Sequence, residues 1–387
     1  MKRRKLARTG LEIAPLVFGG NVFGWTADEG TSFDLLDRFV DAGLNAIDTA
    51  DVYSSWAPGN KGGESETIIG KWMKSQKNRD KVIVITKVGS DTGQGKTDLS
   101  APYIEKAIDE SLRRLQTDSV DLYLSHWPDT TVTYEETLGA YDKLLKKGKV
   151  RFIGVSNLDA KELREALDTA DRHNFPRYQV LQPEYNLYDR SPFEGKLSDL
   201  CMKEGLGVVT YFSLAKGFLS GKYRGEADLG KSVRGGDVKG YLNPRGKKIL
   251  AALDEVSKRR SAKPAEVALA WVIAQPGVTA PISSATDATQ LDSLVKAASL
   301  ELKREDIEQL NATGRSAPRV RRQVGRPKAR ESFHFSSRAC RFGDGFAWRA
   351  SVGPRGRPDG IITTSDRQTR LHGRRQDTQI ARPRCEW

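Results

Sequence analysis

The sequence has few of the side chains that bind metals or form disulfides. Among its 387 residues are three cysteines and four histidines, and no two cysteines have the C-x-x-C spacing. Structural zinc sites and disulfide frameworks need such side chains in clusters, so the sequence predicts no metal site. The H-E-x-x-H and G-x-S-x-G motifs are also missing, which excludes the signatures of zinc peptidases and of many serine hydrolases. Three scattered cysteines are typical of a reducing compartment and predict a cytoplasmic protein.

Long apolar runs are missing too. No window approaches the roughly 18 uninterrupted apolar residues of a membrane span, so we expect no contact with a membrane. The start, Met1-Lys-Arg-Arg-Lys5, has the charge of a signal peptide, but no apolar stretch follows it, and we expect no leader. A strand followed by G-x-G-x-x-G is also missing, because Gly19-Gly-Asn-Val-Phe-Gly24 has the wrong spacing. The sequence therefore does not predict a Rossmann domain.

The positive charge is confined to the end of the chain. Residues 315–387 hold 17 Arg and one Lys against six acidic residues, a net charge of +12, whereas residues 1–314 are nearly neutral. This stretch is rich in Arg, Gly, Pro and Ser and has no apolar period, so it cannot offset the entropy of ordering. We predict a folded domain at 1–316 and a disordered tail at 317–387. Our interpretation is a tail unrelated to the domain, such as a segment read from a shifted frame; a nucleic-acid-binding arm is the disfavoured alternative.

Short apolar segments alternate with stretches of helical spacing. The predicted strands lie at 16–20, 45–48, 82–86, 120–125, 150–155, 178–181, 207–211 and 278–282. The predicted helices lie at 32–42, 64–74, 101–115, 134–147, 159–172, 194–204, 246–274 and 287–298. Strands that are apolar throughout are buried on both faces, as in a parallel sheet covered by helices. We predict an α/β fold, a (β/α)8 TIM barrel with an N-terminal β-hairpin at 2–14; a doubly wound open sheet is the rival.

Four polar side chains stand at or just beyond the ends of three predicted strands. Asp48 ends one strand and Tyr53 follows it, while Lys87 and His126 follow two others. A parallel barrel brings such positions to one face, where barrel enzymes have their active sites. The connection at 212–245 is too long for an ordinary barrel loop and is typical of a lid or a binding loop. Each of the four also has a structural alternative, such as a helix cap for Asp48.

These side chains are suited to proton transfer. A phenol has a pKa of about 10, and an ammonium about 4 Å away interacts with a phenolate by roughly 4 kcal/mol at an effective dielectric of 20. Lys87 should therefore lower the pKa of Tyr53 by about two to three units. Asp48 would hold Lys87, and His126 would bind the substrate oxygen. Because no metal or nucleophile is predicted, a bound redox cofactor is the natural source of electrons.

The sequence resembles the bacterial aldo-keto reductases over roughly residues 2–314. The resemblance rests on Gly43-Leu-Asn-Ala-Ile-Asp-Thr-Ala-Asp-Val-Tyr53, Gly63-Glu-Ser-Glu66, Thr86-Lys87, His126-Trp-Pro128 and Lys146-Lys-Gly-Lys-Val-Arg-Phe-Ile-Gly-Val-Ser-Asn157. It implies an oxidoreductase of (β/α)8 fold that reduces aldehydes or ketones with hydride from NADPH. Tyr53 would be the proton donor, tuned by Lys87 and Asp48, and His126 would orient the carbonyl.

The resemblance also implies the cofactor-binding residues. These are Ser156, Asn157 and Gln182 for the carboxamide, Tyr211 for stacking, Ser213, Leu214, Lys216 and Gly217 for the pyrophosphate, and Ser284, Thr286 and Gln290 for the adenosine. Tyr211 could instead be a core aromatic and Lys216 a solvated lysine. Thr286 stands where many members have an arginine for the 2′-phosphate, and Leu294 where asparagine is usual. We expect NADPH, with NADH use left open.

Three tryptophans complete the expected site. Trp25, Trp56 and Trp127 would line an aromatic mouth that suits hydrophobic carbonyl substrates, although Trp25 and Trp56 could simply pack in loops. We predict an NAD(P)H-dependent reductase of small carbonyl compounds. The alternative is a regulatory subunit of an ion channel or another partner, which binds the cofactor with little catalysis. The sequence leaves the physiological substrate and the oligomeric state open, a homo-oligomer included.

Overall fold

The computed structural model describes residues 1–314. Within this part of the chain, eight parallel strands close into a barrel in the order β10-β3-β4-β5-β6-β7-β8-β9. The strands are β3 (Val17–Gly19), β4 (Ala46–Asp48), β5 (Ile83–Val88), β6 (Val120–Ser125), β7 (Val150–Ser156), β8 (Val180–Gln182), β9 (Gly207–Thr210) and β10 (Ala280–Ser283). The predicted barrel is thus confirmed and the open sheet was wrong, because β10 pairs with β3 and leaves no edge. The predicted disordered tail and the boundary after residue 316 lie outside the described residues.

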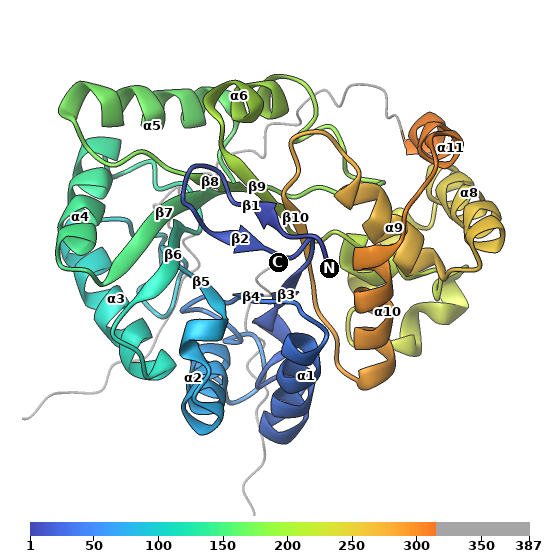
Figure 1. Ribbon diagram of the computed structural model, residues 1–387, viewed down its shortest axis with the longest axis horizontal. Helices are drawn as coiled ribbons and strands as arrows, with labels where there is room; N and C mark the ends of the chain where they lie inside the picture. Colours follow the sequence, from blue (N-terminus) through green and yellow to red (C-terminus); the bar gives the residue numbers. More distant parts are fainter. Residues whose placement is uncertain (315–387) are drawn as a thin grey trace, which may run out of the picture. The chain divides into compact units, whose positions relative to one another are not determined.

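Helices surround the barrel (Figure 1). They are α1 (Glu29–Asp41), α2 (Glu64–Gln76), α3 (Ala101–Leu115), α4 (Tyr134–Lys146), α5 (Ala160–His173), α6 (Lys196–Glu204), α8 (Pro244–Arg260), α9 (Pro264–Ile273), α10 (Ala288–Ser299) and α11 (Arg304–Gly314). None of the helices in the described part is long and apolar enough to cross a membrane.

Helix α5 shows how local sequence sets these elements. Asp159 accepts hydrogen bonds from the backbone of Lys161 and Glu162, and the Glu162 side chain accepts one from the Asp159 N–H, which forms a capping box. Asn174 ends the helix in the left-handed region, with φ of 52°. Between these ends, apolar residues recur at helical spacing and are buried, namely Leu163, Ala166, Leu167 and Ala170.

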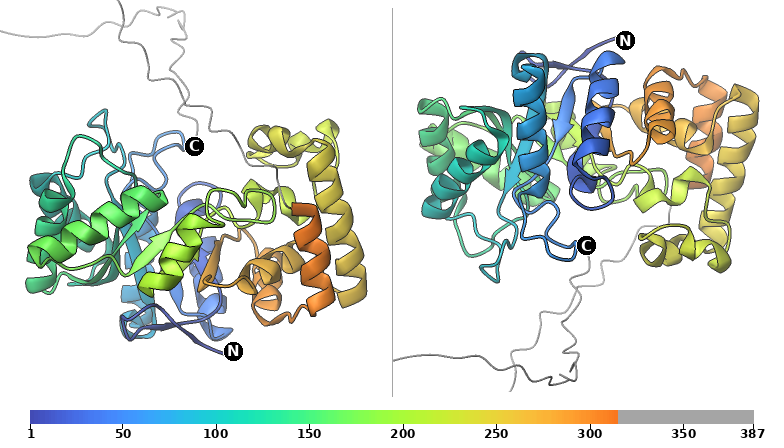
Figure 2. Two further views of the ribbon diagram at one scale, coloured as in Figure 1. Left: turned by 90° about the horizontal axis from the view of Figure 1, so that it is seen from above. Right: turned by 90° about the horizontal axis from the view of Figure 1, so that it is seen from below.

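The N-terminal hairpin closes the floor of the barrel. Strands β1 (Arg4–Lys5) and β2 (Glu12–Ile13) pair antiparallel, and Figure 1 shows them crossing the barrel opening. Leu6, Leu11 and Ile13 join the apolar cluster inside the barrel. The side views place this hairpin at one end and the 212–245 connection toward the other (Figure 2). The hairpin therefore leaves the carboxyl ends of the strands as the open face.

Strand periodicity decides which side chains enter the barrel. Ile83 and Ile85 belong to the interior cluster, whereas Val84 packs in the outer core under the helices. Because side chains alternate along a strand, Lys87 must also point inward, one step above Ile85. The same parity applies to Asp48 above Ala46 in β4. The predicted polar residues of β4 and β5, Asp48 and Lys87, thus lie above an apolar layer inside the barrel.

Three parts of the fold differ from the sequence prediction. The stretch predicted as one helix at 246–274 is two helices, because Ser261 takes a left-handed conformation with φ of 51° and Pro264 opens α9. Helix α11 was not predicted, and it packs on α8 with Leu310 buried. The 212–245 connection is not structureless: it contains η3 (Ala215–Ser220), η4 (Glu226–Lys231), α7 (Gly235–Val238) and η5 (Lys239–Tyr241).

Candidate active site

The Lys87 ammonium is the centre of the polar cluster at the open face. It is fully buried and donates hydrogen bonds to Asp48 Oδ2 at 2.8 Å, to the Thr49 carbonyl oxygen at 2.7 Å and to the Tyr53 hydroxyl at 3.0 Å. All three hydrogens of the ammonium are thereby used. The Lys87 Nζ also lies 4.6 Å from the centre of the Tyr53 ring. Three of the predicted catalytic residues therefore form one connected group.

The electrostatics of this group differ in one respect from our expectation. Burial acts to lower the pKa of Lys87, but the charges of Asp48 and the Tyr53 phenolate outweigh it, and the pKa lies above its ordinary value. Burial raises the pKa of Tyr53 above 10, against the opposing effect of the Lys87 charge. The expected lowering of the pKa of Tyr53 was therefore wrong for the free protein. The expectation counted the attraction of Lys87 but omitted the cost of burying a phenolate and the repulsion from Asp48.

His126 completes the predicted set as a neutral side chain. Its Nδ1 lies 2.8 Å from the Ser90 hydroxyl oxygen, and its ring centre lies 5.8 Å from that of Tyr53. Burial and the Lys87 charge lower the pKa of His126 well below 6.5, so the imidazole is uncharged near neutral pH. When Ser90 donates to Nδ1, the ring hydrogen is on Nε2. Ser90 was missed in the sequence, although its place three residues beyond Lys87 was a usable signal.

A second set of hydrogen bonds connects the predicted carboxamide residues to this group. Gln182 Nε2 donates to Asp48 Oδ1 at 2.8 Å, and the Ser156 hydroxyl donates to the Gln182 carbonyl oxygen at 2.7 Å. Asn157 donates to the His126 carbonyl oxygen at 2.8 Å and accepts from the Tyr211 hydroxyl at 2.7 Å. The structure thus brings the residues that end β7 and β8, together with Tyr211 just beyond β9, into one wall beside the predicted catalytic residues.

The segment after β9 has an unusual backbone. Phe212, Ala215, Lys216 and Gly217 all have positive φ, between 47° and 99°. Ser213, to which we assigned a phosphate contact, is buried and donates its hydroxyl hydrogen to the Thr210 carbonyl oxygen at 3.0 Å. Its side chain therefore anchors the segment to the strand. Its hydroxyl hydrogen is therefore not directed at a ligand in this structure. Lys216 Nζ lies 5.2 Å from the Phe212 ring centre.

The predicted adenosine residues lie beyond β10 and at the start of α10. The Ser284 hydroxyl donates to Asn21 Oδ1 at 2.6 Å, and a Cβ on Gly19 would come within 2.6 Å of the Ser284 hydroxyl oxygen. Gly19 is thus required for this close approach. Thr286 donates its N–H and hydroxyl hydrogens to Gln290 Oε1 at 3.2 and 3.3 Å. This end of the site presents hydroxyl and amide groups.

Aromatic rings extend the site toward solvent. Trp56 packs edge to face on both Tyr53 and Trp25, with ring centres 5.6 and 5.9 Å apart, and Trp127 stacks on His126 at 5.9 Å. The three predicted tryptophans are all partly buried. Arg234, from the 212–245 connection, lies with its guanidinium carbon 5.1 Å from the Trp25 ring centre. We predicted that connection as a binding loop, but no sequence signal singled out Arg234.

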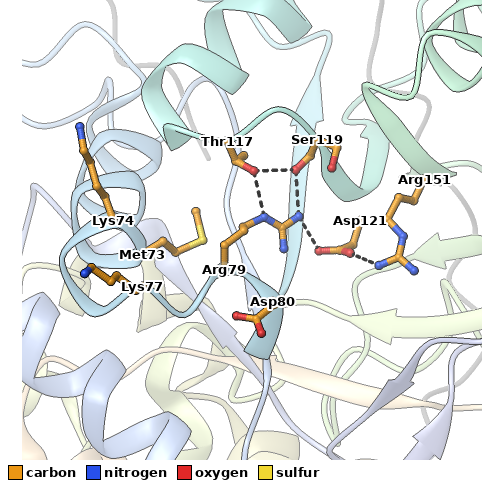
Figure 3. Close-up of a pocket in the computed structure, with 9 residues that line it drawn as sticks. All are labelled: Met73, Lys74, Lys77, Arg79, Asp80, Thr117, Ser119, Asp121 and Arg151. Atoms are coloured by element: carbon orange, nitrogen blue, oxygen red, sulfur yellow. Dashed lines mark hydrogen bonds and ion pairs between the residues drawn. The ribbon is translucent and has the colours of Figure 1, made fainter.

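A second polar cluster lies at the opposite end of the strands and lines a cleft (Figure 3). Asp121, near the start of β6, forms an ion pair with Arg79 at 2.9 Å and accepts a hydrogen bond from Arg151 at 2.7 Å. Arg79 also bonds to Thr117, Val82 and Ser119. The Asp121 carboxylate is buried, whereas both guanidiniums are partly exposed. In residues 1–314 no three His, Cys, Asp or Glu side chains are grouped to hold a metal ion.

The fold and the geometry of the site together indicate a class of enzyme. A charged lysine held against a protonated phenol and a neutral histidine, above the apolar floor of a (β/α)8 barrel, is chemically suited to exchange a proton with a substrate oxygen. Residues 15–315 match the model of the Aldo/keto reductase family. The chain belongs to this family, and it is an NAD(P)H-dependent oxidoreductase that acts on small carbonyl compounds.

Curated relatives agree with this assignment. The chain is 34% identical to the "uncharacterized oxidoreductase YrpG" of Bacillus subtilis, over 80% of this chain and 95% of the relative. It is 33% identical to the aldo-keto reductase YhdN of the same organism, over 80% and 93%. A "probable voltage-gated potassium channel subunit beta" of rice is 32% identical, over 82% and 98%. Nearly the whole length of each relative is thus matched by about four fifths of this chain.

The residues at the open face fit the nicotinamide nucleotide that the family uses. The Gln182 side chain donates from Nε2 to Asp48, which leaves its Oε1 to accept a hydrogen bond from an amide N–H. Gly217, with φ of 99°, and Gly19, on which a Cβ would meet the Ser284 hydroxyl, add no side chains to this face. Lys216 supplies positive charge for phosphates. The donors, the acceptor and the charge are therefore of the kinds that such a nucleotide needs.

Proposed function

We propose that this protein reduces aldehydes or ketones to alcohols, with Tyr53 as the general acid. The observation that carries this proposal is the hydrogen bond of 3.0 Å from the buried Lys87 ammonium to the Tyr53 hydroxyl. An ammonium in that position stabilises the phenolate that forms when Tyr53 gives up its proton. Asp48 holds Lys87 in place through its contact of 2.8 Å.

The proton transfer is consistent with the raised pKa of Tyr53. The nicotinamide nucleotide, when bound, supplies the hydride that reduces the carbonyl carbon. The carbonyl oxygen then develops the charge of an alkoxide, which is a much stronger base than a phenolate, so Tyr53 donates to it readily. Because burial keeps the pKa of Tyr53 above 10, the phenol is protonated and ready at neutral pH. His126, through Nε2–H, donates to the same oxygen and orients it.

For the cofactor we propose NADPH, held by the predicted residues at the carboxyl ends of β7 to β10. Ser156, Asn157 and Gln182 would hold the carboxamide and Tyr211 would stack on the nicotinamide. The segment from Ser213 to Gly217, with Leu214 and Lys216, would hold the pyrophosphate, and Ser284, Thr286 and Gln290 would hold the adenosine.

Thr286 should set the preference between the two nucleotides. Its hydroxyl has a single hydrogen, which would have to leave Gln290 Oε1 to reach a 2′-phosphate, whereas a guanidinium offers two parallel bonds and a charge. We therefore expect NADH to compete, and Thr286→Arg to increase the preference for NADPH by about tenfold or more. Titration of intrinsic tryptophan fluorescence with each nucleotide measures this. An unaltered ratio of the two dissociation constants in Thr286→Arg would remove the 2′-phosphate from this position.

The catalytic proposal is tested with two tyrosine variants that each lose a phenolic hydroxyl group. Tyr53→Phe should lower kcat for a panel of aldehydes by about 10²- to 10⁴-fold, the usual contribution of a general acid. The control is Tyr123→Phe, because the Tyr123 hydroxyl is buried, makes no hydrogen bond and lies outside the site. Nucleotide oxidation is followed by absorbance. Equal activity in Tyr53→Phe and the wild type would remove Tyr53 as the acid.

The similarity to the rice relative favours a second candidate function, that of a cofactor-binding subunit that acts through a partner. The complete set of Asp48, Tyr53, Lys87 and His126 favours catalysis. Nucleotide binding without turnover of any aldehyde or ketone in the panel would favour the partner role instead.

A reducing compartment such as the cytoplasm suits the protein, because Cys201 is a buried free thiol.

A further inference from the structure

Asp51 is a buried carboxyl group that the proposed mechanism does not use. The residue is 5% exposed, and neither of its carboxyl oxygens has a hydrogen-bond partner within residues 1–314. Buried acids are ordinarily paired or hydrogen-bonded, because an isolated carboxylate is costly to remove from water. Asp48, three residues earlier, shows the ordinary case, since it accepts from Lys87 and Gln182. Asp51 therefore needs another way to avoid an uncompensated charge.

The backbone around Asp51 is held on two sides. Asp51 lies in the loop between Asp48 and Tyr53, and its N–H donates to the Lys87 carbonyl oxygen at 3.2 Å. Its own carbonyl oxygen lies against Gly62, on which a Cβ would come within 2.9 Å of that oxygen. Turning the buried carboxyl group out to water would therefore require the loop that carries Tyr53 to move.

The cations that act on Asp51 are already bound to other groups. The three hydrogens of the Lys87 ammonium are all used elsewhere, and Arg114 donates from Nε to Glu66 at 2.7 Å. Glu66 is itself fully buried, and its negative charge acts on Asp51. A charged Asp51 would thus lie near a second buried carboxylate, without a hydrogen bond of its own.

The surroundings of Asp51 favour its neutral form. Burial and the Glu66 charge raise the pKa of Asp51 well above 3.8, and the charges of Arg114 and Lys87 oppose this rise without cancelling it, as does the nearby Val52 N–H. The titratable and charged groups that act on Asp51, or on which it acts, come from each element packed around it: Glu66 of α2, Lys87 of β5, Tyr103 and Arg114 of α3, Tyr123 of β6 and Tyr141 of α4. Burial raises the pKa of each of these three tyrosines, so they carry no charge near neutral pH.

We propose that Asp51 holds a proton in the folded protein, so that a neutral carboxylic acid lies inside the loop that carries Tyr53 and the folded protein loses stability when a rise in pH removes this proton. Ionisation would leave a buried negative charge near Glu66 with no hydrogen bond to stabilise it. Asp51 is thus a pH-sensitive element of the fold. This role concerns stability and is independent of the proposed reduction.

An acid whose pKa is higher in the folded than in the unfolded protein makes the fold less stable as pH rises. The pKa of an unfolded aspartate is about 3.9. Between about pH 5 and the raised pKa of Asp51, each pH unit should therefore lower the folding equilibrium constant by about tenfold through this group. Asp51→Asn has no such proton to lose, so it should lack this dependence.

The test compares urea unfolding of the wild type and of Asp51→Asn from about pH 5 to 8. The folding equilibrium constant of the variant, divided by that of the wild type, should rise about tenfold between about pH 5 and 6 and level off above the pKa of Asp51. Asp51→Ala, which needs no hydrogen bond at this position, should show the same trend and takes the place of an asparagine variant that does not fold.

Asp306→Asn is the matched control, because Asp306 is fully buried but paired with Arg259 and Arg260 at 2.9 and 2.5 Å. Burial acts to raise the pKa of Asp306, but the hydrogen bonds from Arg260 and Arg259 outweigh it, and the pKa lies below its ordinary value. Above about pH 5 this acid is therefore charged in both the folded and the unfolded protein. The same ratio for Asp306→Asn should stay below one and level across this range.

A level or falling ratio for Asp51→Asn would mean that Asp51 is charged in the folded protein, for example beside a bound cation, and would overturn the proposal. Infrared spectroscopy gives a second measurement that needs no unfolding. At about pH 6, the wild type should have one carbonyl band of a protonated carboxyl group more than Asp51→Asn. Identical spectra in this region would assign any such proton to another acid and contradict the proposal.

Discussion

Each end of the barrel has a buried carboxylate paired with basic side chains, and the two ends do different things. At the hairpin end, Asp121 forms an ion pair with Arg79 and accepts hydrogen bonds from Arg151 and from the Val84 N–H at 2.9 Å. The two guanidiniums are partly exposed and reach water. At the open end, Asp48 accepts from Lys87 and Gln182, and the Lys87 ammonium is fully buried. A buried carboxylate paired with a basic side chain is therefore common to both ends, but only at the open end is the base buried as well.

The difference lies in which polar atoms remain available. In the Asp121 cluster the buried carboxylate is bound by Arg79, Arg151 and the Val84 N–H, which holds β5, β6 and β7 together (Figure 3). The donors left over belong to guanidiniums that are partly exposed to water. At the open end, the chain of hydrogen bonds stops at the Tyr53 hydroxyl and at the free ring nitrogen of His126. A buried ion pair is thus a candidate site when a titratable group beside it has a hydrogen-bond donor or acceptor that no protein group uses.

The largest effect is expected from breaking the ion pair at the open end. Lys87→Met should lower kcat/KM by about 100-fold or more, and it should lower the free energy of unfolding by about 3–5 kcal/mol because Asp48 is left buried and unpaired. The double variant Lys87→Met/Asp48→Asn should recover most of the stability and none of the activity. Urea unfolding and steady-state kinetics measure both. Recovery of activity in the double variant would contradict the role of Lys87.

A smaller and purely structural effect is expected at the hairpin end. Asp121→Asn keeps the shape but removes the charge from two guanidiniums, and it should lower the free energy of unfolding by about 1–3 kcal/mol. The ratio of kcat/KM to that of the wild type should stay within about twofold, because the change lies at the far end of the strands. A stable Asp121→Asn protein with strongly reduced kcat/KM would break the distinction between the two ends.

A single neutral hydrogen bond should matter less. Ser90→Ala removes the partner of His126 Nδ1 and should lower kcat/KM by roughly 2- to 10-fold, the usual value of one such bond. Ser75→Ala is the matched control, since the Ser75 hydroxyl donates only to the Trp72 carbonyl oxygen in α2. Indistinguishable kinetics for both variants would mean that Ser90 does not orient the imidazole.

The smallest expected change is with pH. Reduction needs protonated Tyr53, so the rate falls only as pH rises through the pKa of that phenol, which burial raises above 10. It also needs neutral His126, whose pKa lies well below 6.5 through burial and the Lys87 charge. The profile of kcat/KM should therefore be level from about pH 7 to 9. A fall within this range would instead match the lowered pKa of Tyr53 that the sequence alone suggested.

The sequence by itself determined the barrel and the composition of the site. Eight apolar segments separated by helical stretches specify a parallel sheet covered by helices and favour a barrel, because each strand is buried on both faces. The pairing of β10 with β3 decided that the sheet is closed. Residue parity then directs Asp48 and Lys87 inward above Ala46 and Ile85, since side chains alternate along a strand. These features depend on local spacing, and local spacing is readable along the chain.

Tertiary structure alone decided how the site is tuned. The pKa of Tyr53 rises because burial outweighs the nearby ammonium, and burial is a property of everything packed around the ring. Ser90 and Arg234 join the site through contacts with His126 and Trp25 that lie far away in the sequence. The place of α11 likewise depends on its packing against α8. The distances between side chains, their exposure and their unused hydrogen-bond donors and acceptors are set only in the folded chain. Each of them depends on contacts between residues that are far apart in the sequence.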